Sequence, residues 1–179
     1  MTGLGDDWVR QDDGYRHRHA ARVMPIDADG NLLLFRGHDR YDVNHQWWFT
    51  VGGGIKPGET PETAALREAY EETGFQLHGD ELLGPAIERR ATFRFSQETV
   101  RQFELFFLTY LDNVRPEVDR AENTVSEQEL LDEWRWFSAA ELEELATDAQ
   151  VWPRELPSLL HRWKNGWDGE VAYIDESNT

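Results

Sequence analysis

The segment Gly53–Phe75 constrains the fold of this chain more than any other, because its residues predict a glycine-rich loop leading into a capped helix. Thr60 is a favourable N-cap, and the proline after it suits the first helical position. Gly74 suits the position just past the last turn, where a left-handed backbone is common. We therefore predict a helix over Pro61–Thr73.

Three glutamates of this helix share one face. Glu68, Glu71 and Glu72 stand at positions i, i+3 and i+4, and Ala64 and Ala65 leave room beside them. Like charges at this spacing destabilise a helix by roughly 0.2–0.5 kcal/mol per pair. A hard divalent cation such as Mg²⁺ offsets that repulsion, since carboxylate oxygens are its preferred ligands. The simpler alternative is a solvated acidic face that binds nothing.

The rest of the helix has a structural interpretation. Arg67 lies near the acidic face and can pair with Glu71 or, across the loop, with Glu59. The glycines at 52, 53, 54 and 58 allow the loop backbone to approach the helix closely. On the opposite side, four residues are expected to pack on a sheet: Leu66, Ala69, Tyr70 and Thr73.

The remaining chain alternates strand and helix patterns without the regularity of βαβ units. This predicts an α+β or mixed α/β fold, a sheet with helices packed on it. A turn at Asp27–Gly30 joins the first two strands, and Gly37–Gln46 is expected to be a polar loop. The expected strands are His19–Ile26, Asn31–Arg36, Trp47–Val51, Leu82–Phe95, Thr99–Leu111 and Glu133–Phe137, and the later helices are Ala139–Ala146 and Glu155–Lys164.

One motif combines the features of Gly53–Phe75 at fixed spacing: Gly53, Glu59, Arg67-Glu68, Glu71-Glu72 and Gly74. This pattern resembles the Nudix box of the Nudix hydrolase family, with every fixed position present. The order of the surrounding strands and the later EWRWFSAAEL stretch are also similar to that family, so the resemblance extends over about residues 18–145.

The resemblance implies an α/β/α sandwich built on a mixed sheet, and hydrolysis of a pyrophosphate bond with Mg²⁺ or Mn²⁺. The substrates of the family are nucleoside diphosphates linked to another group. By matching positions, Glu68, Glu71 and Glu72 would hold the metal ion. Arg67 and Glu59 would orient these ligands, and Gly53 would shape the loop beside them.

The same resemblance leaves the general base open between a glutamate of the motif and a carboxylate outside it. The outside candidates are Glu127 and Glu129, in the acidic segment before EWRWF, where solvated loop acids are the alternative. A domain that binds a nucleotide as a sensor, without hydrolysing it, is the second functional hypothesis. Isomerisation of isopentenyl diphosphate, another reaction of this fold, relies on a cysteine that this chain lacks.

Candidate substrate contacts lie outside the motif. Arg36 ends the second strand and can reach a phosphate, while Trp48 can stack on a base or pack in the core, like its neighbour Trp47. Arg90 and Arg94 share one face of a strand, from which they can hold phosphate or solvate an edge.

The charge of the chain restricts its partners. With 18 basic and 35 acidic residues the formal net charge is −17, which repels nucleic acid polymers and anionic lipid surfaces and disfavours RNA decapping. A small nucleotide that arrives with its metal is compatible with this charge. The N-terminus lacks the pattern of a secretion signal, and no apolar run reaches the ~18 residues of a membrane helix, so we expect a cytoplasmic protein.

We expect three parts along the chain: a flexible N-terminal arm (1–17), a Nudix hydrolase domain (18–149) and a C-terminal helical extension (150–179). The apolar face of the extension is expected to dock on the domain or on a second subunit, and its last residues to be frayed. Monomer and homodimer both remain open.

Overall fold

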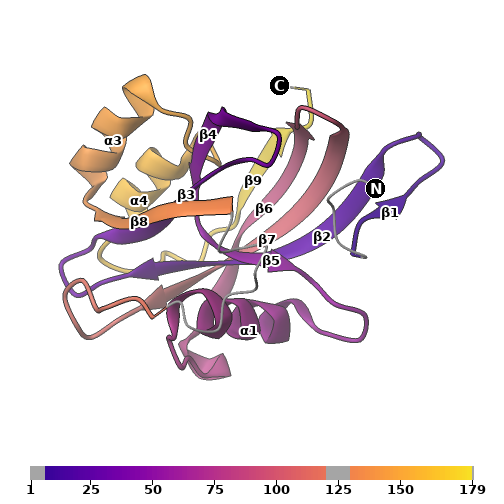
Figure 1. The fold of residues 1–179 in the computed structure, drawn as a ribbon. Coiled ribbons are helices and arrows are strands. Elements are labelled where there is room, and N and C mark those ends of the chain that lie inside the picture. The colour runs from indigo at the N-terminus through magenta and orange to yellow at the C-terminus, as the bar shows by residue number, and fades with distance from the viewer. Residues whose placement is uncertain (1–6, 120–129, 179) are drawn as a thin grey trace.

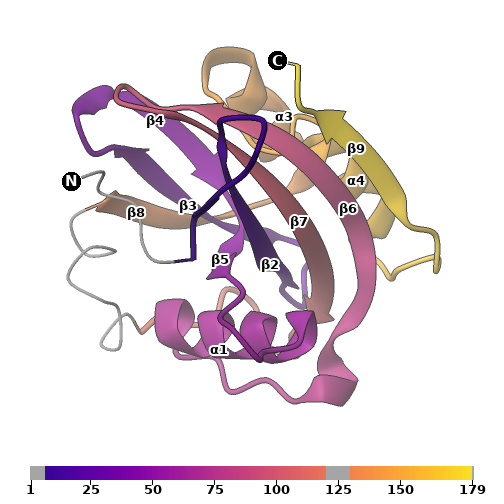
Figure 2. The ribbon, with the colours of Figure 1, turned by 90° about the vertical axis from the view of Figure 1, so that its right-hand side faces the viewer.

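The computed structural model describes residues 7–119 and 130–178, which form a mixed sheet with helices on both sides. Figure 1 shows α1 below the sheet and the pair α3 and α4 above it, and Figure 2 shows the strong curvature of the long strands. This arrangement confirms the predicted α/β/α architecture. The elements are β1 (Val9–Arg10), β2 (Arg16–Ile26), β3 (Leu32–Asp39), β4 (Asp42–Phe49), β5 (Val51–Gly54), α1 (Pro61–Thr73), β6 (Leu83–Arg94), β7 (Thr99–Tyr110), β8 (Leu131–Phe137), α3 (Ala139–Asp148), α4 (Leu156–Trp163) and β9 (Ala172–Glu176).

The sheet runs in the order β4-β3-β2-β7-β6-β9, with β2–β7 and β6–β9 parallel and the other pairs antiparallel. Strand β2 pairs with β3 only at Ile26–Leu32 and then with β5 over Ala20–Val23. The sheet therefore splits along β2, and the space between its two halves lies beside α1.

Two apolar clusters fill the layers. One lies between the sheet and α1 and contains Val23, Phe35 and Ala65. The other lies between the sheet and the helices α3 and α4, where Leu160 and Trp163 are completely buried. None of the described helices is long and apolar enough to cross a membrane.

The predicted turn at Asp27–Gly30 is confirmed, and the Asp27 side chain stabilises it. Its Oδ1 accepts hydrogen bonds from the backbone N–H groups of Asp29 (3.0 Å) and Asn31 (2.8 Å). The long strands β6 and β7 and the three helices were also predicted within a few residues of their observed ends.

The prediction of a polar loop over Gly37–Gln46 was wrong, because β3 continues to Asp39 and β4 begins at Asp42. The part of β4 before Trp47 is largely exposed on both faces, so its residues carry no apolar alternation. The buried Asp39 carboxylate stabilises the tight connection between β3 and β4, because it accepts a hydrogen bond from the Tyr41 N–H (2.8 Å). It also accepts a hydrogen bond from the Ser96 N–H (2.6 Å), in the connection between β6 and β7.

The two ends of the chain differ from expectation. Residues 7–17, assigned from sequence to a flexible arm, include β1 and the start of β2, and Trp8 is buried. The prediction that the last five residues are frayed was wrong for Asp175 and Glu176, which end β9, pair with β6 in parallel register and include the buried Glu176 carboxylate.

Candidate active site

Helix α1 carries the predicted acidic residues, and its ends form as the sequence predicted. The Thr60 hydroxyl accepts the Thr63 N–H at 3.2 Å, and Gly74, at φ 74°, donates its N–H to the Tyr70 carbonyl. The predicted sheet-facing side of this helix was partly wrong. Ala69 and Thr73 are buried, but Tyr70 is 43% exposed and Leu66 is half-buried.

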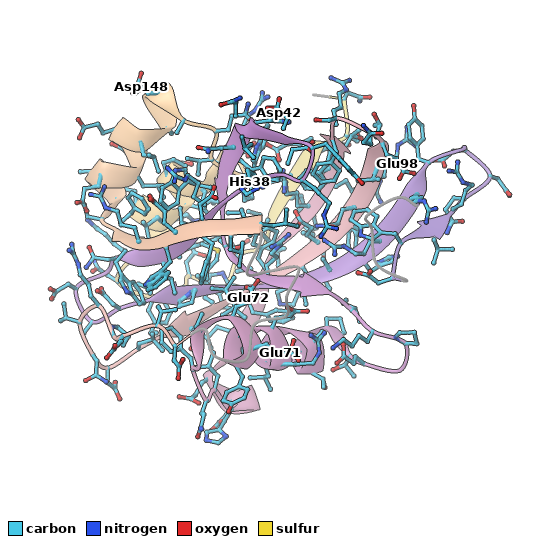
Figure 3. The ribbon with its side chains drawn as sticks, viewed as in Figure 1. His38, Asp42, Glu71, Glu72, Glu98 and Asp148 are labelled. Carbon is cyan, nitrogen blue, oxygen red and sulfur yellow. The ribbon has the colours of Figure 1, made fainter. Side chains whose placement is uncertain are left out.

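The buried stripe of α1 instead includes two of the three acids, Glu68 and Glu72, which are 5% and 4% exposed. Both face the split in the sheet, whereas Glu71 is half-buried beside Arg67. Figure 3 labels Glu72 between the helix and the sheet and Glu71 on the helix itself. Carboxylates replace apolar residues here because the surface they face is the polar backbone of β5 and a cavity.

The backbone of β5 approaches these carboxylates closely. Glu72 Oε2 accepts the Gly52 N–H at 2.8 Å. A Cβ at Gly53 would lie 2.7 Å from Glu68 Oε1, so only glycine fits that position without moving Glu68. At Gly52, with φ 131°, a Cβ would lie 2.3 Å from the Ala21 carbonyl oxygen. Gly53 is thus required by the close approach of β5 to the helix, and Gly52 by its left-handed backbone and the close approach of β5 to β2.

Arg67 connects the acids. Its Nε and Nη2 donate to the two oxygens of Glu59 at 2.7 and 2.9 Å. Its Nη1 donates to Glu68 at 2.6 Å and to Glu71 at 3.0 Å, and Nη2 also reaches the Gly54 carbonyl. The sequence offered Glu71 and Glu59 as alternative partners, and Arg67 binds both.

The electrostatics follow from this bidentate pairing. The hydrogen bonds from Arg67 lower the pKa of the Glu59 carboxyl to about 2, despite the opposing effect of burial. The same bonds raise the pKa of the Arg67 guanidinium above its ordinary value. Both groups are therefore charged over the whole physiological range, and Arg67 partly neutralises the acidic face.

A cavity of about 620 Å³ opens beside Glu68 and Glu72 in the split of the sheet. Its volume lies within the usual range for small-molecule sites. Aromatic and charged residues line it together. The aromatic side chains among them are Trp8, Tyr41, Trp47, Phe49, Phe93, Phe95, Phe106 and Trp152, and the basic ones are Arg18, Arg22, Arg40, Lys56 and Arg89.

The chemistry of these donors suits a magnesium ion. Within residues 7–119 and 130–178, no three acidic or histidine side chains converge as a complete metal cluster. Mg²⁺ does not require such a cluster, since it is commonly held by one or two carboxylates together with waters and substrate phosphates. Glu68 and Glu72 supply two carboxylates on the cavity wall, and Glu71 adjoins them through Arg67.

The other predicted contact residues lie apart from this cavity, except Gly53, which lines it. Trp48 is buried in the cluster under α3 and α4, where it packs edge-on against Phe137, while Trp47 lines the cavity. Arg36 pairs with Asp132 and Glu133, at 3.7 and 3.4 Å.

Arg90 and Arg94 are exposed on β6, and neither lines the main cavity. Glu127 and Glu129, the candidate general bases outside the motif, lie outside the described residues. The structure therefore brings Gly53 together with the acids and Arg67, and leaves Arg36, Trp48, Arg90 and Arg94 elsewhere.

Sequence reasoning missed a buried polar group at the inner end of the cavity: Arg22, Arg89, Gln102, Glu104 and, behind them, Glu176. One signal was available, because Glu104 interrupts the apolar run of β7 and a buried carboxylate requires a basic partner. The sequence could not show which of the many arginines that partner was.

The comparison with family models decides the classification, since the NUDIX domain model matches residues 16–160. The chain belongs to the Nudix family. Among its relatives, an RNA pyrophosphohydrolase of Yersinia pestis is 29% identical over 136 residues, 71% of each chain. One of the same name from Agrobacterium fabrum is 42% identical over 64 residues, covering 34% of this chain and 38% of that protein. The chain is accordingly a hydrolase of pyrophosphate bonds.

Solved structures agree on the fold. The MutT protein of Methanosarcina mazei aligns with a TM-score of 0.54 and 19% identity, over 82% of this chain and 91% of that one. The dihydroneopterin triphosphate pyrophosphohydrolase of E. coli aligns with a TM-score of 0.54 and 22% identity, over 81% and 95%. Identities this low support the shared fold alone.

Proposed function

We propose that this Nudix protein is a Mg²⁺-dependent pyrophosphohydrolase that cleaves a small nucleoside-diphosphate-linked substrate, with Mn²⁺ as a possible substitute. The observation that carries the proposal is the pair of buried carboxylates, Glu68 and Glu72, on the wall of an aromatic and basic cavity. A protein that only bound a nucleotide would gain nothing from burying two acids beside the phosphate-binding region.

Each part of the site has a proposed role. Glu68, Glu71 and Glu72 hold the ion, and Arg67, fixed by Glu59, keeps their carboxylates in place. When bound, the ion supplies Lewis acidity that neutralises charge developing on the pyrophosphate.

The cavity provides the rest of the binding energy. Its exposed basic side chains, Arg40 and Lys56, attract phosphate oxygens, and its aromatic side chains offer faces on which a nucleobase can stack. We further propose that a carboxylate accepts a proton from the attacking water, either a glutamate of the motif or one of the outside candidates, Glu127 and Glu129. We place the activity in the cytoplasm and expect no membrane or nucleic acid polymer as partner.

A substrate panel with product identification tests this proposal. Purified protein is incubated with Mg²⁺ and nucleoside triphosphates, dinucleoside polyphosphates, nucleotide sugars or ADP-ribose. We expect mononucleotide release from one class, and at least a hundredfold lower kcat in Glu72→Gln. Glu62→Gln, exposed in the first turn of the same helix, is the matched control and should keep wild-type activity. Full activity in Glu72→Gln would refute the assigned role.

The name of the relatives, RNA pyrophosphohydrolase, favours one further candidate, a pyrophosphate bond on an RNA. A short 5′-triphosphate RNA therefore belongs in the panel, and preferential cleavage of it over all small nucleotides would replace the small-molecule proposal. Tight, metal-independent binding of a nucleotide that stays uncleaved would instead indicate a sensor.

A further inference from the structure

A line of four buried charges crosses the sheet at the inner end of the cavity. It contains Arg22 on β2, Glu104 on β7, Arg89 on β6 and Glu176 on β9, and none is more than 9% exposed. Glu104 accepts from Arg22 Nε at 2.8 Å and from Arg89 Nη1 at 2.5 Å. Arg89 Nε donates to Glu176 at 2.5 Å, so each charge has an opposite neighbour.

The Arg22 end of this line reaches the backbone beside the metal-binding acids. Arg22 Nη1 donates to the carbonyl oxygens of Thr50 (3.1 Å) and Gly52 (2.8 Å). These two carbonyls flank the Val51–Gly52 peptide, whose N–H donates to Glu72 Oε2 at 2.8 Å. A single guanidinium thus holds both sides of the peptide that orients Glu72.

We propose that Arg22 is a positioning residue for Glu72, and that Glu104, Arg89 and Glu176 hold Arg22 in the required orientation. The inference rests on the proposed function in one respect, the role of Glu72 as a metal ligand. It also gives β9, which lies beyond the residues matched by the family model, a part in the active site.

The geometry requires the fork of an arginine. Arg22 uses Nε for Glu104 and Nη1 for the two carbonyls, whereas a lysine ammonium is a single point that cannot span both groups. Burial opposes ionisation of Glu104, yet Arg89 and Arg22 lower its pKa to about 2. The Glu104 carboxylate therefore stays charged, and its hydrogen bond to Arg22 is retained, throughout the physiological pH range.

Mn²⁺ affinity, measured by electron paramagnetic resonance without substrate, tests this inference. Loss of the groups behind a metal ligand typically weakens binding 10–100-fold. We expect Arg22→Lys to raise the Mn²⁺ Kd about tenfold, and Glu176→Gln, two links further away, about threefold. Arg162→Lys, in an exposed ion pair elsewhere, and Asp175→Asn, exposed on β9 next to Glu176 and bonded to Ser177, are matched controls that should keep wild-type affinity. Thermal unfolding of every variant shows whether it is folded.

A role limited to stability would lower the melting temperature and leave the Mn²⁺ Kd unchanged in the folded variants, and that result would overturn the inference. If Arg22→Lys does not fold, the result for Glu176→Gln decides by the same criterion. Glu72→Gln separates this inference from the proposed function. If it abolishes Mn²⁺ binding while Arg22→Lys does not weaken it, only the positioning role is wrong; if the wild type binds no Mn²⁺, both fail.

Discussion

Replacing Gly53 by alanine tests whether the position of Glu68 depends on the missing side chain of β5. The added Cβ would lie 2.7 Å from Glu68 Oε1, 2.8 Å from Cδ and 2.9 Å from Oε2. Ordinary contact begins near 3.4 Å, so the carboxylate must retreat by about 0.7 Å. That shift strains the 2.6 Å hydrogen bond between Glu68 and Arg67.

We expect Gly53→Ala to lower the catalytic rate much more than the stability of the fold. A misplacement of about 1 Å commonly costs about a hundredfold in rate, so we expect kcat/KM to fall roughly 30–100-fold. The backbone of Gly53 lies outside the left-handed region, so alanine adds no backbone strain there and even restricts the unfolded chain. The melting temperature should therefore change by only a few degrees.

The assay is Mg²⁺-dependent hydrolysis of the substrate found in the panel, together with Mn²⁺ affinity. Gly79→Ala is the matched control, because nothing lies within 4 Å of its added Cβ and its backbone is ordinary. Wild-type kcat/KM and wild-type Mn²⁺ affinity in folded Gly53→Ala would refute the reasoning.

Three further variants test other parts of the structure. Since the pKa of Glu59 lies near 2 instead of 4.5, its bond to Arg67 stabilises the fold above pH 4.5 and is lost as the pH falls towards 2. Glu59→Gln should cost about 2 kcal/mol of unfolding free energy at pH 7 and much less at pH 2.5 in urea titrations; an equal cost at both would contradict this. Leu160→Ala, completely buried, should cost about 2–5 kcal/mol, whereas exposed His161→Ala should cost under about 0.5 kcal/mol. Tyr70→Ala should also lower the unfolding free energy by about 0.5 kcal/mol or less, because the ring is largely exposed. A decrease above about 2 kcal/mol would show that the Tyr70 ring packs against the sheet, as the sequence predicted.

Much of the fold could be predicted because its signals are local. The caps of α1, the turn at Asp27–Gly30 and the apolar strands β6 and β7 depend on residues a few positions apart. The first part of β4, before Trp47, and the strand β9 were missed for the opposite reason. Their residues are mainly polar or exposed, and they are ordered by hydrogen bonds to distant strands.

The candidate site also has a part that local sequence could predict and a part that it could not. The motif on α1 is sufficient to identify the acids and Arg67, because their spacing lies within two turns of one helix. The orientation of that helix was only partly predictable, since periodicity treats glutamate as a solvent-facing residue. Glu68 and Glu72 are buried because the backbone of β5 and the arginine beside it satisfy their oxygens.

The sequence by itself determined the family, the capped helix and the set of carboxylates that can hold a metal ion. Only the tertiary structure decided which residues support those carboxylates through hydrogen bonds. Arg22 and Glu104 are 82 positions apart, and Arg89 and Glu176 are 87 apart, yet each pair is joined by a buried hydrogen bond. Such pairs are selected by strand order and register, and among 18 basic and 35 acidic residues no local pattern distinguishes them.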